Sequence, residues 1–403
     1  MEIDGYAKDF SSPKVFISDD LVVEILSRAG QKTVIRCKSV CKNWQDLITR
    51  FVIARLKTLP PLVSGFYYAQ KEYKFTTDAD LITTDADLKF LECPHEVGLM
   101  DMSVDTGLSF LRRSSIVAVS SHQGYVLCAE DPGKPEKQYG FLDAYQFRYI
   151  ICNPLTRQWV ELPKPCHPHY IDRVHLFCYN QKGCNEFKVV SFVPARVNND
   201  FYVEMYTSET GKWNSSRVPF NEILKGYSFL LNGSVYFSTT KNNIYAYDLM
   251  EEHMRCLELP LQVSWGYKLL GVSAGSIYYA LDDRESFKVW VLDDINGWSL
   301  QHEIDYGIVH KQLPGRYDIT YRSETEKYYG FSFEPLAFHP LNPNVIFVNV
   351  AKHGMYNRDM AILYHRDSER VQVIGDLKHC NTTTVIPYSL PAWVPSLNII
   401  TLI

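Results

Sequence analysis

From about residue 62 onward, apolar residues alternate with polar ones in short runs, and this period-two pattern continues for more than three hundred residues. Such alternation is typical of β-strands with one buried face. Helical spacing is nearly absent from this part of the chain. Aromatic residues make up 14% of the sequence and include 27 Tyr and 21 Phe, and these residues pack well on a pleated sheet. We therefore expect residues 58–403 to form an all-β domain.

Two phrases recur within the β region. One is a glycine followed by an alternating apolar strand, at Gly124, Gly233 and Gly275. The other is a strand, a polar turn, a Trp or apolar residue and often Leu-Pro, and it begins at 151 (ICNPLTRQWVELP), 206, 247 and 292. Equivalent places in the second phrase are held by Trp159, Trp213 and Trp298, with Met254 or Arg255 standing there once. We expect the three Trp residues to be core residues between strands.

The phrases repeat every forty to sixty residues, which is the range of a four-stranded propeller blade with variable loops. One such sheet cannot bury both faces, whereas blades stacked around an axis can. At about 50 residues per blade, this length predicts a β-propeller of six or seven blades. The apolar run Ser396–Ile403 is expected to close the ring on the first blade. A β-sandwich is the structural alternative, because the repeats are degenerate.

Residues 14–57 differ in kind from the rest. Ser18 is a good helix N-cap, and Asp19 and Asp20 place negative charge in the first turn of a helix that Gly30 ends. Thr33 is expected to cap a second helix. A third helix carries an apolar stripe, at Val40, Cys41, Trp44, Leu47, Ile48 and Phe51.

Three short helices cannot bury all of these apolar faces among themselves, so part of the surface should face another domain or another protein. The segment 14–57 also carries a net charge of +5, which suits an acidic partner. The predicted organisation is thus multidomain, α plus all-β, with an N-terminal tail at 1–13, a helical module at 14–57 and the β domain at 58–403.

The helical module resembles the plant type of F-box. That pattern starts Leu-Pro, continues with an acidic pair and a Leu-Val-Val-Glu-Ile-Leu helix, and ends Val-Cys-Lys-x-Trp-x-x-Leu-Ile. This chain matches it from Asp19 to Arg28, at Lys32, and at Val40, Cys41, Lys42, Trp44, Leu47 and Ile48. It departs from the pattern at Ile17-Ser18 and Ala29-Gly30, where Leu-Pro is usual, and at Cys37, where Phe is usual.

The resemblance implies that the module docks onto a Skp-type adaptor, which binds a cullin scaffold carrying the ubiquitin-transfer machinery. The adaptor-binding residues that it implies are Ile17, Ser18, Leu21, Ile25, Leu26, Val34, Val40, Cys41 and Trp44. For Trp44, Leu47 and Ile48, a purely internal packing role is an equal alternative. Ser18 and Gly30 stand where the pattern has Pro. Pro at a helix start restricts the conformations of the unfolded chain, and Gly increases them, so we expect these two departures to weaken docking.

The stretch from Asn153 to Pro163 resembles a signature of the F-box-associated, kelch-like β-propeller domains of plant F-box proteins. The pairing implies a substrate-binding domain beside the F-box, although the substrate-binding residues are unknown. The predicted function is substrate-recognition adaptor of a Skp–cullin–F-box ubiquitin ligase, without catalysis of its own. The alternatives are an F-box protein that binds a target or ligand without ubiquitin transfer, and a propeller enzyme or glycan binder.

The sequence predicts no cofactor and no metal. Thiol and imidazole groups are densest at Cys166, His167, His169, His175, Cys178 and Cys184, but their spacing matches no standard zinc site. The duplicated TTDADL at Thr76 and Thr83 lacks the glycine turn and bidentate Glu of a calcium loop, and predicts a solvated hairpin or loop. Motifs for a nucleophile elbow, a phosphate-cradling loop, a dinucleotide or an HExxH zinc site are absent.

The net charge of −5 gives no support to a nucleic-acid partner. The start MEIDGYAKDF has no secretory character, and no run of about eighteen apolar residues predicts a membrane span. We therefore expect a protein of the cytoplasm or nucleus, or both, whose partners are the Skp-type adaptor, a cullin bound through it and a substrate protein.

Overall fold

A computed structural model describes residues 17–29, 31–58, 63–70, 73–75, 81–83, 87–92, 104–113, 116–130, 147–169, 173–181, 184–195, 200–241, 243–261, 267–282, 286–293, 297–304, 306–313, 319–321, 327–329, 331–352, 360–376 and 385–390. These residues belong to two compact units, a helical unit described within 17–58 and a β unit described within 63–390. No helix in the described ranges combines the length and apolar character that crossing a bilayer requires.

The helical unit contains α1 (Asp19–Ser27), α2 (Gln31–Cys37), α3 (Lys42–Leu47), a π-helical turn (Ile48–Val52) and α4 (Ile53–Thr58). The Ser18 hydroxyl accepts a hydrogen bond from the Leu21 N–H at 3.3 Å, which confirms the predicted N-cap of α1. The prediction that Thr33 caps the second helix is wrong, because α2 already begins at Gln31. The third helix continues through the π-helical turn into α4, and Cys41 caps its start.

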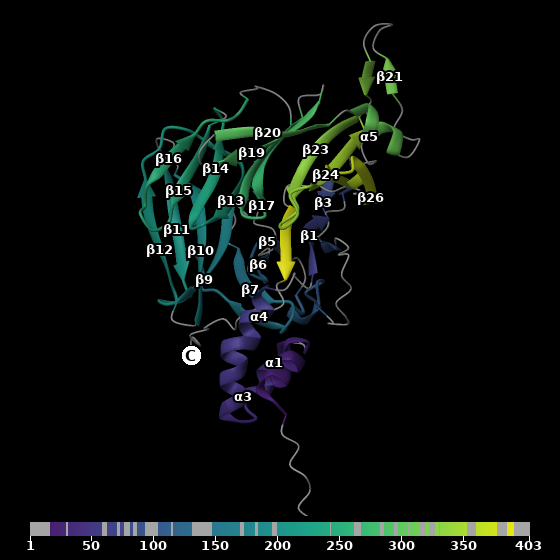
Figure 1. The fold of residues 1–403 in the computed structure, drawn as a ribbon. Helices are drawn as coiled ribbons and strands as arrows, with labels where there is room; N and C mark the ends of the chain where they lie inside the picture. The colour runs from purple at the N-terminus through teal and green to yellow at the C-terminus, as the bar shows by residue number, and fades with distance from the viewer. Residues whose placement is uncertain are drawn as a thin grey trace, which may run out of the picture. The chain divides into compact units, whose positions relative to one another are not determined.

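The β unit is a propeller of six blades among the described residues (Figure 1). The first blade is β5 (Ile116–His122), β6 (Tyr125–Glu130), β7 (Arg148–Asn153) and β8 (Gln158–Glu161). The second is β9 (Val174–Gln181), β10 (Cys184–Pro194), β11 (Phe201–Thr207) and β12 (Lys212–Val218). The third is β13 (Leu224–Leu231), β14 (Ser234–Thr239), β15 (Ile244–Asp248) and β16 (Met254–Leu257).

The fourth blade is β17 (Tyr267–Ser273), β18 (Ser276–Asp282), β19 (Phe287–Asp293) and β20 (Gly297–Ile304). The fifth is β23 (Phe331–Phe338), β24 (Val345–Lys352), β25 (Met360–His365) and β26 (Arg370–Asp376). The sixth is β4 (Asp87–Glu92), β1 (Val63–Gln70) and β27 (Val385–Leu390). One strand of each blade contacts its counterpart in the next blade, and the contacts run β27, β5, β9, β13, β17, β23 and back to β27. This closed circle of inner strands excludes the β-sandwich alternative.

The sixth blade closes the ring by joining distant parts of the chain. Strand β27 pairs antiparallel with β1, with Leu390 opposite Val63 and Val385 opposite Tyr68. The last described strand of the chain therefore pairs with the start of the β unit. The strand that does so is β27, while the predicted closing run 396–403 lies outside the described residues.

The two recurring phrases correspond to two turns of the blade. Two-residue turns with consecutive positive φ angles join the first two strands of three blades, at Gln123-Gly124, Asn232-Gly233 and Ala274-Gly275. This is the type I′ geometry, which matches the twist of a hairpin and favours glycine. The second phrase is the turn before the outer strand, where Arg157, Gly211 and Glu252 have positive φ. The fifth blade has the same turn at Glu369, although its sequence carries no Trp.

Apolar cores lie between neighbouring blades. One core packs β5–β8 against β9 and β10 and against the sixth blade, and others join the second blade to the third, the third to the fourth, and the fourth to the fifth. A further core joins the fifth blade to the sixth through Phe66 and Phe347, whose rings stack at 5.0 Å. Each blade thus buries both faces, as the repeat argument requires.

Smaller elements decorate the ring. They are a 3₁₀ turn (Ser109–Leu111), the hairpin β2 (Tyr73–Phe75) and β3 (Leu81–Thr83), α5 (Tyr306–Gln312), and the hairpin β21 (Ile319–Tyr321) and β22 (Lys327–Tyr329). The TTDADL duplication falls partly on the first hairpin, whereas Asp78, Asp80 and Asp85 lie outside the described residues.

Candidate functional site

The helical unit has a small core of its own. Its buried apolar side chains are Val22, Leu26, Val34, Leu47, Ile48, Val52 and Leu56. They come from α1, α2 and the continuous helical run from α3 to α4, and they recur at helical spacing because each helix turns one stripe inward. Among the described residues, this core does not bury every apolar side chain of the helices.

Six large apolar side chains of the helical unit are exposed, and we call them the exposed apolar set. They are Ile17, Leu21, Ile25, Ile35, Val40 and Phe51, each between 41% and 62% accessible. Leu21 and Ile25 are four residues apart, so they share one side of α1, and Ile17 precedes the Ser18 cap of that helix. Exposed apolar groups at this density on so small a unit make it the candidate interaction surface.

The residues that the F-box resemblance implied as adaptor contacts do not all reach the surface. Those that are exposed are Ile17, Ser18, Leu21, Ile25, Val40 and Cys41. Trp44 is half-buried and packs against the core. Leu26 and Val34 are only 4% and 0% accessible and hold the helices together, so the structure assigns them to the core and not to the surface.

Two members of the exposed apolar set were missing from the predicted contacts. Ile35 neighbours buried Val34 on α2, and the packing of α2 against the other helices turns Val34 inward and leaves Ile35 exposed. Phe51 lies in the π-helical turn, where Ile48 and Val52 are buried and Phe51 is 55% exposed. A helical stripe drawn with the ordinary period places Phe51 inward. Because the π-helical turn has more residues per turn than an α-helix, the ordinary helical period could not predict from the sequence that Phe51 is exposed.

Polar contacts fix the helices that carry the exposed apolar set. Glu24 on α1 forms ion pairs with Arg28, at 2.5 Å, and with Arg55 on α4. The hydrogen bond from Arg55 holds the pKa of the Glu24 carboxyl below its ordinary value. The Asn43 amide donates to Asp19 at 3.0 Å and ties the start of α3 to the start of α1.

In the propeller, two of the repeated Trp residues link neighbouring blades. The Trp213 indole N–H donates to the Pro163 carbonyl at 2.7 Å, and the Trp298 N–H donates to the Glu258 carbonyl at 2.6 Å. Each carbonyl lies just after the outer strand of the preceding blade. Trp159 is 44% exposed and the Arg113 guanidinium lies over its ring at 5.4 Å, so the prediction of a core position is wrong for Trp159.

Of the predicted cluster of His and Cys residues, His167 and His169 belong to a hydrogen-bonded network at the junction of the first two blades, whereas His175 bonds Ser228. His169 Nε2 lies 2.9 Å from Glu204 Oε2, His167 bonds the other carboxylate oxygen, and Tyr149 OH lies 3.0 Å from His169 Nδ1. Tyr149, His169 and Glu204 are at most 1% accessible, whereas the side chain of His167 is 38% accessible. Within the described ranges, no three His, Cys, Asp or Glu residues are arranged to hold a metal ion.

Comparison with known protein families divides the chain into the same two parts, a helical unit and a propeller. The family described as "F-box protein At3g26010-like, beta-propeller" matches residues 106–385. The F-box domain family matches residues 17–55. The two matches correspond to the propeller and to the helical unit.

Among individual proteins, the chain is similar to F-box proteins of Arabidopsis thaliana. It is 23% identical to F-box protein At5g07610, over 78% of this chain and 76% of that protein. It is 26% identical to F-box protein At3g26010, over 72% and 68% of the two chains. A solved structure from Lactobacillus plantarum covers 78% of this chain and 82% of its own at 9% identity, with a TM-score of 0.38, which is too low to bear on function.

Proposed function

Because this chain belongs to the plant F-box proteins with an At3g26010-like β-propeller, we propose that it is a non-catalytic, substrate-recruiting adaptor of a Skp–cullin–F-box ubiquitin ligase. The helical unit binds a Skp-type adaptor protein, and a cullin joins through that adaptor. The propeller holds the substrate protein. The setting in which this assembly would work is the cytoplasm or nucleus.

The exposed apolar set is the observation that supports the proposal most directly. Leu21 and Ile25 are about half exposed on α1, while Val22 and Leu26 of the same helix are almost fully buried. A helix with apolar side chains on both sides has one stripe for its own core and another for a partner. Burying Leu21 and Ile25 against a partner would contribute to the hydrophobic centre that a stable interface needs.

The contribution of the propeller to ubiquitin transfer would be proximity. A substrate held beside the transferring enzyme reacts as if at a high effective concentration, and this requires no catalytic side chain in the adaptor. The rigid, closed ring suits this role, because binding loops mounted on a fixed scaffold keep their geometry.

The test is quantitative binding of the full-length protein to a purified Skp-type adaptor, with Leu21→Asp and Ile25→Asp as variants. Each substitution places a charge in the centre of the proposed interface, and we expect each to weaken binding by about tenfold or more. Ile223→Asp is the matched control, because Ile223 is an equally exposed apolar residue of the propeller. Circular dichroism should show that all three variants remain folded.

The binding results distinguish the proposed ligase adaptor from the alternative functions. Unchanged binding by both α1 variants would refute the proposal for this surface. Adaptor binding that depends on α1, without cullin joining the complex, would indicate an F-box protein that captures a target and does not direct ubiquitin transfer. Ubiquitination of a propeller-bound protein in the reconstituted complex would complete the case.

A further inference from the structure

The propeller contains a cavity of about 360 Å³ along its inner strands. All six blades line it, through β5, β9, β13, β17, β23 and β27. Close packing is the rule between the blades, so this space is a distinct feature of the axis. Its volume is within the range of small-molecule sites.

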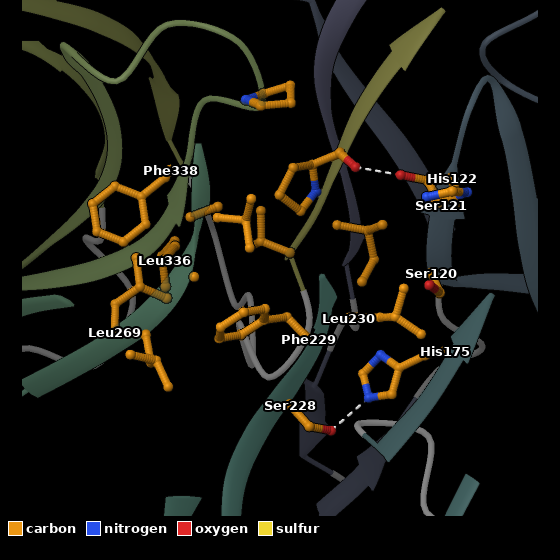
Figure 2. A pocket seen from close by; sticks show the side chains of 18 of the residues that line it. Ser120, Ser121, His122, His175, Ser228, Phe229, Leu230, Leu269, Leu336 and Phe338 are labelled. Carbon is orange, nitrogen blue, oxygen red and sulfur yellow. Dashed lines mark hydrogen bonds between the residues drawn. The ribbon is translucent and has the colours of Figure 1, made fainter. Parts of the chain in front are cut away.

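The lining has two unlike sides (Figure 2). Leu269, Leu336 and Phe338 lie together on one side, from the fourth and fifth blades. The polar groups lie on the other side, from the first three blades, and they are Ser120, Ser121, His122, His175 and Ser228. Phe229 and Leu230 lie between these sides in the view of Figure 2. The fourth and fifth blades also contribute Lys268 and Glu334 to the lining. A molecule that fills the cavity therefore meets an apolar group of Leu269, Leu336 and Phe338 on one flank and the hydroxyl and imidazole groups on the other.

The polar groups also connect the inner strands, and each connection leaves bonding capacity. Ser120 Oγ accepts from the Leu176 N–H at 3.0 Å and still has its own O–H to donate. Ser121 Oγ donates to the Pro387 carbonyl at 2.5 Å and still has lone pairs to accept with. His122 Nδ1 accepts from the Cys178 N–H at 3.0 Å, which puts the proton of the neutral ring on Nε2. Donors and acceptors thus occur on the same flank.

The cavity carries little net charge. Burial lowers the pKa of His122 and of His175 to about 4, so both imidazoles are neutral at physiological pH. The lining includes one other basic and one acidic side chain, Lys268 and Glu334, whose charges cancel in sum. An ionised ligand would leave water without a compensating excess of opposite charge, which is costly.

We propose that this cavity binds a small, uncharged, amphipathic organic molecule, with a ring or branched hydrocarbon on one side and hydroxyl or carbonyl groups on the other. The hydrocarbon part lies against Leu269, Leu336 and Phe338. The polar edge bonds to the Ser120, Ser121 and His122 groups. Because the molecule would contact every blade, it would stabilise the ring as well as occupy it. This site is independent of the proposed binding of a Skp-type adaptor by the helical unit.

The test uses the purified full-length protein and two fluorescent naphthalenes of similar size. Prodan is uncharged and has a fused ring and a carbonyl, whereas toluidinonaphthalene sulfonate is anionic. We expect prodan to bind saturably with a blue-shifted emission, and to bind at least about tenfold more tightly than the sulfonate. Saturating prodan should also raise the thermal unfolding midpoint, since it binds only the folded state.

Two substitutions fill the cavity from different strands, Leu230→Trp on β13 and Leu336→Trp on β23. Each should weaken prodan binding by about tenfold or more while the protein stays folded. Ile223→Trp is the control, because it adds the same side chain at an exposed position outside the cavity. Two filling variants are used so that misfolding of one does not decide the test.

Three results would overturn the proposal. The first is no saturable prodan signal with the wild-type protein, which would mean that the cavity holds water only. The second is equal prodan binding by the filling variants and by Ile223→Trp, which would place the dye elsewhere. The third is equal or tighter binding of the sulfonate, which would contradict the uncharged class.

Discussion

In the helical unit, six large apolar side chains are exposed within residues 17–58, whereas the propeller exposes seven among its described residues between 63 and 390. The propeller folds its strands into a closed ring, so that each blade buries its apolar faces against two neighbours. The helical unit has no ring to close, and its helices have only one core between them. The difference teaches that the amount of exposed apolar surface follows from architecture. A closed ring of repeats buries its apolar faces between neighbouring repeats, whereas a small open helical bundle leaves part of its apolar surface exposed and available to a partner.

The largest effect that we expect comes from breaking the closure of the ring. Tyr388 of β27 is fully buried, its ring lies 5.3 Å from that of Tyr67, and its hydroxyl donates to the Gly124 carbonyl at 3.2 Å. Tyr388→Ala should lower the free energy of unfolding of the propeller by about 3–5 kcal/mol. Urea unfolding followed by tryptophan fluorescence measures this loss.

Tyr388→Phe is the control for that experiment, because it removes only the hydroxyl and should cost about 1 kcal/mol. Tyr388→Ala should leave the affinity of the helical unit for a Skp-type adaptor unchanged. A parallel loss of both properties would contradict the contrast between a self-sufficient ring and a partner-dependent helical unit.

A second effect concerns pH and a buried imidazole of the propeller. The pKa of His175 is lowered by burial to about 4 in the folded protein, whereas the unfolded side chain binds a proton below about 6.5. The stability that depends on this difference is complete above pH 6.5 and is lost as the pH falls toward 4, by about 3 kcal/mol. Urea unfolding at pH 7 and at pH 4.5 measures it.

In His175→Gln this part of the pH dependence should disappear. Ser228→Ala is the matched control, because it removes the hydroxyl that lies 2.6 Å from His175 Nε2 and keeps the titrating ring. An unchanged pH dependence in His175→Gln would show that other groups account for the loss.

A third prediction compares the two sides of α1. Leu26→Ala removes a side chain that is 4% accessible, and it should lower the local free energy of unfolding of the helical unit by about 2 kcal/mol. Leu21→Ala removes one that is 49% accessible and should change it by less than about 0.5 kcal/mol. Amide hydrogen exchange across 19–27 measures both. The order should reverse for adaptor binding, and equal effects of the two variants in both assays would remove the distinction between core and surface.

The smallest effect concerns the links between blades. Trp213→Phe removes the indole N–H that donates to the Pro163 carbonyl, and it should cost about 1 kcal/mol of stability. Trp159→Phe, at the equivalent but exposed place in the first blade, should cost less than about 0.5 kcal/mol. Thermal unfolding of the two variants side by side measures the difference. Equal losses of stability in the two variants would show that the hydrogen bond from Trp213 to the Pro163 carbonyl does not contribute measurably to stability.

The organisation of the chain into a helical module and a repeated β domain could be predicted because each depends on local pattern. The cap at Ser18, the period-two strands and the Gly124 and Gly233 turns involve residues within a few positions of one another. The candidate surface was predictable only in part. Leu21 and Ile25 lie on the exposed side of α1 as expected, but whether Val34 or Ile35 points outward depends on how α2 packs against the other helices.

By itself, then, the sequence determined the two-part organisation, the period of the strands and the F-box character of the helical segment, since short-range spacing and composition carry this information. The tertiary structure alone decided that the described strands form six blades, that β27 closes the ring on β1, and that Trp213 and Trp298 link blades. It also brought Ser120, His175, Ser228 and Leu336 to one cavity. These features join residues tens to hundreds of positions apart, and such pairings arise from packing of whole blades, which no local pattern encodes.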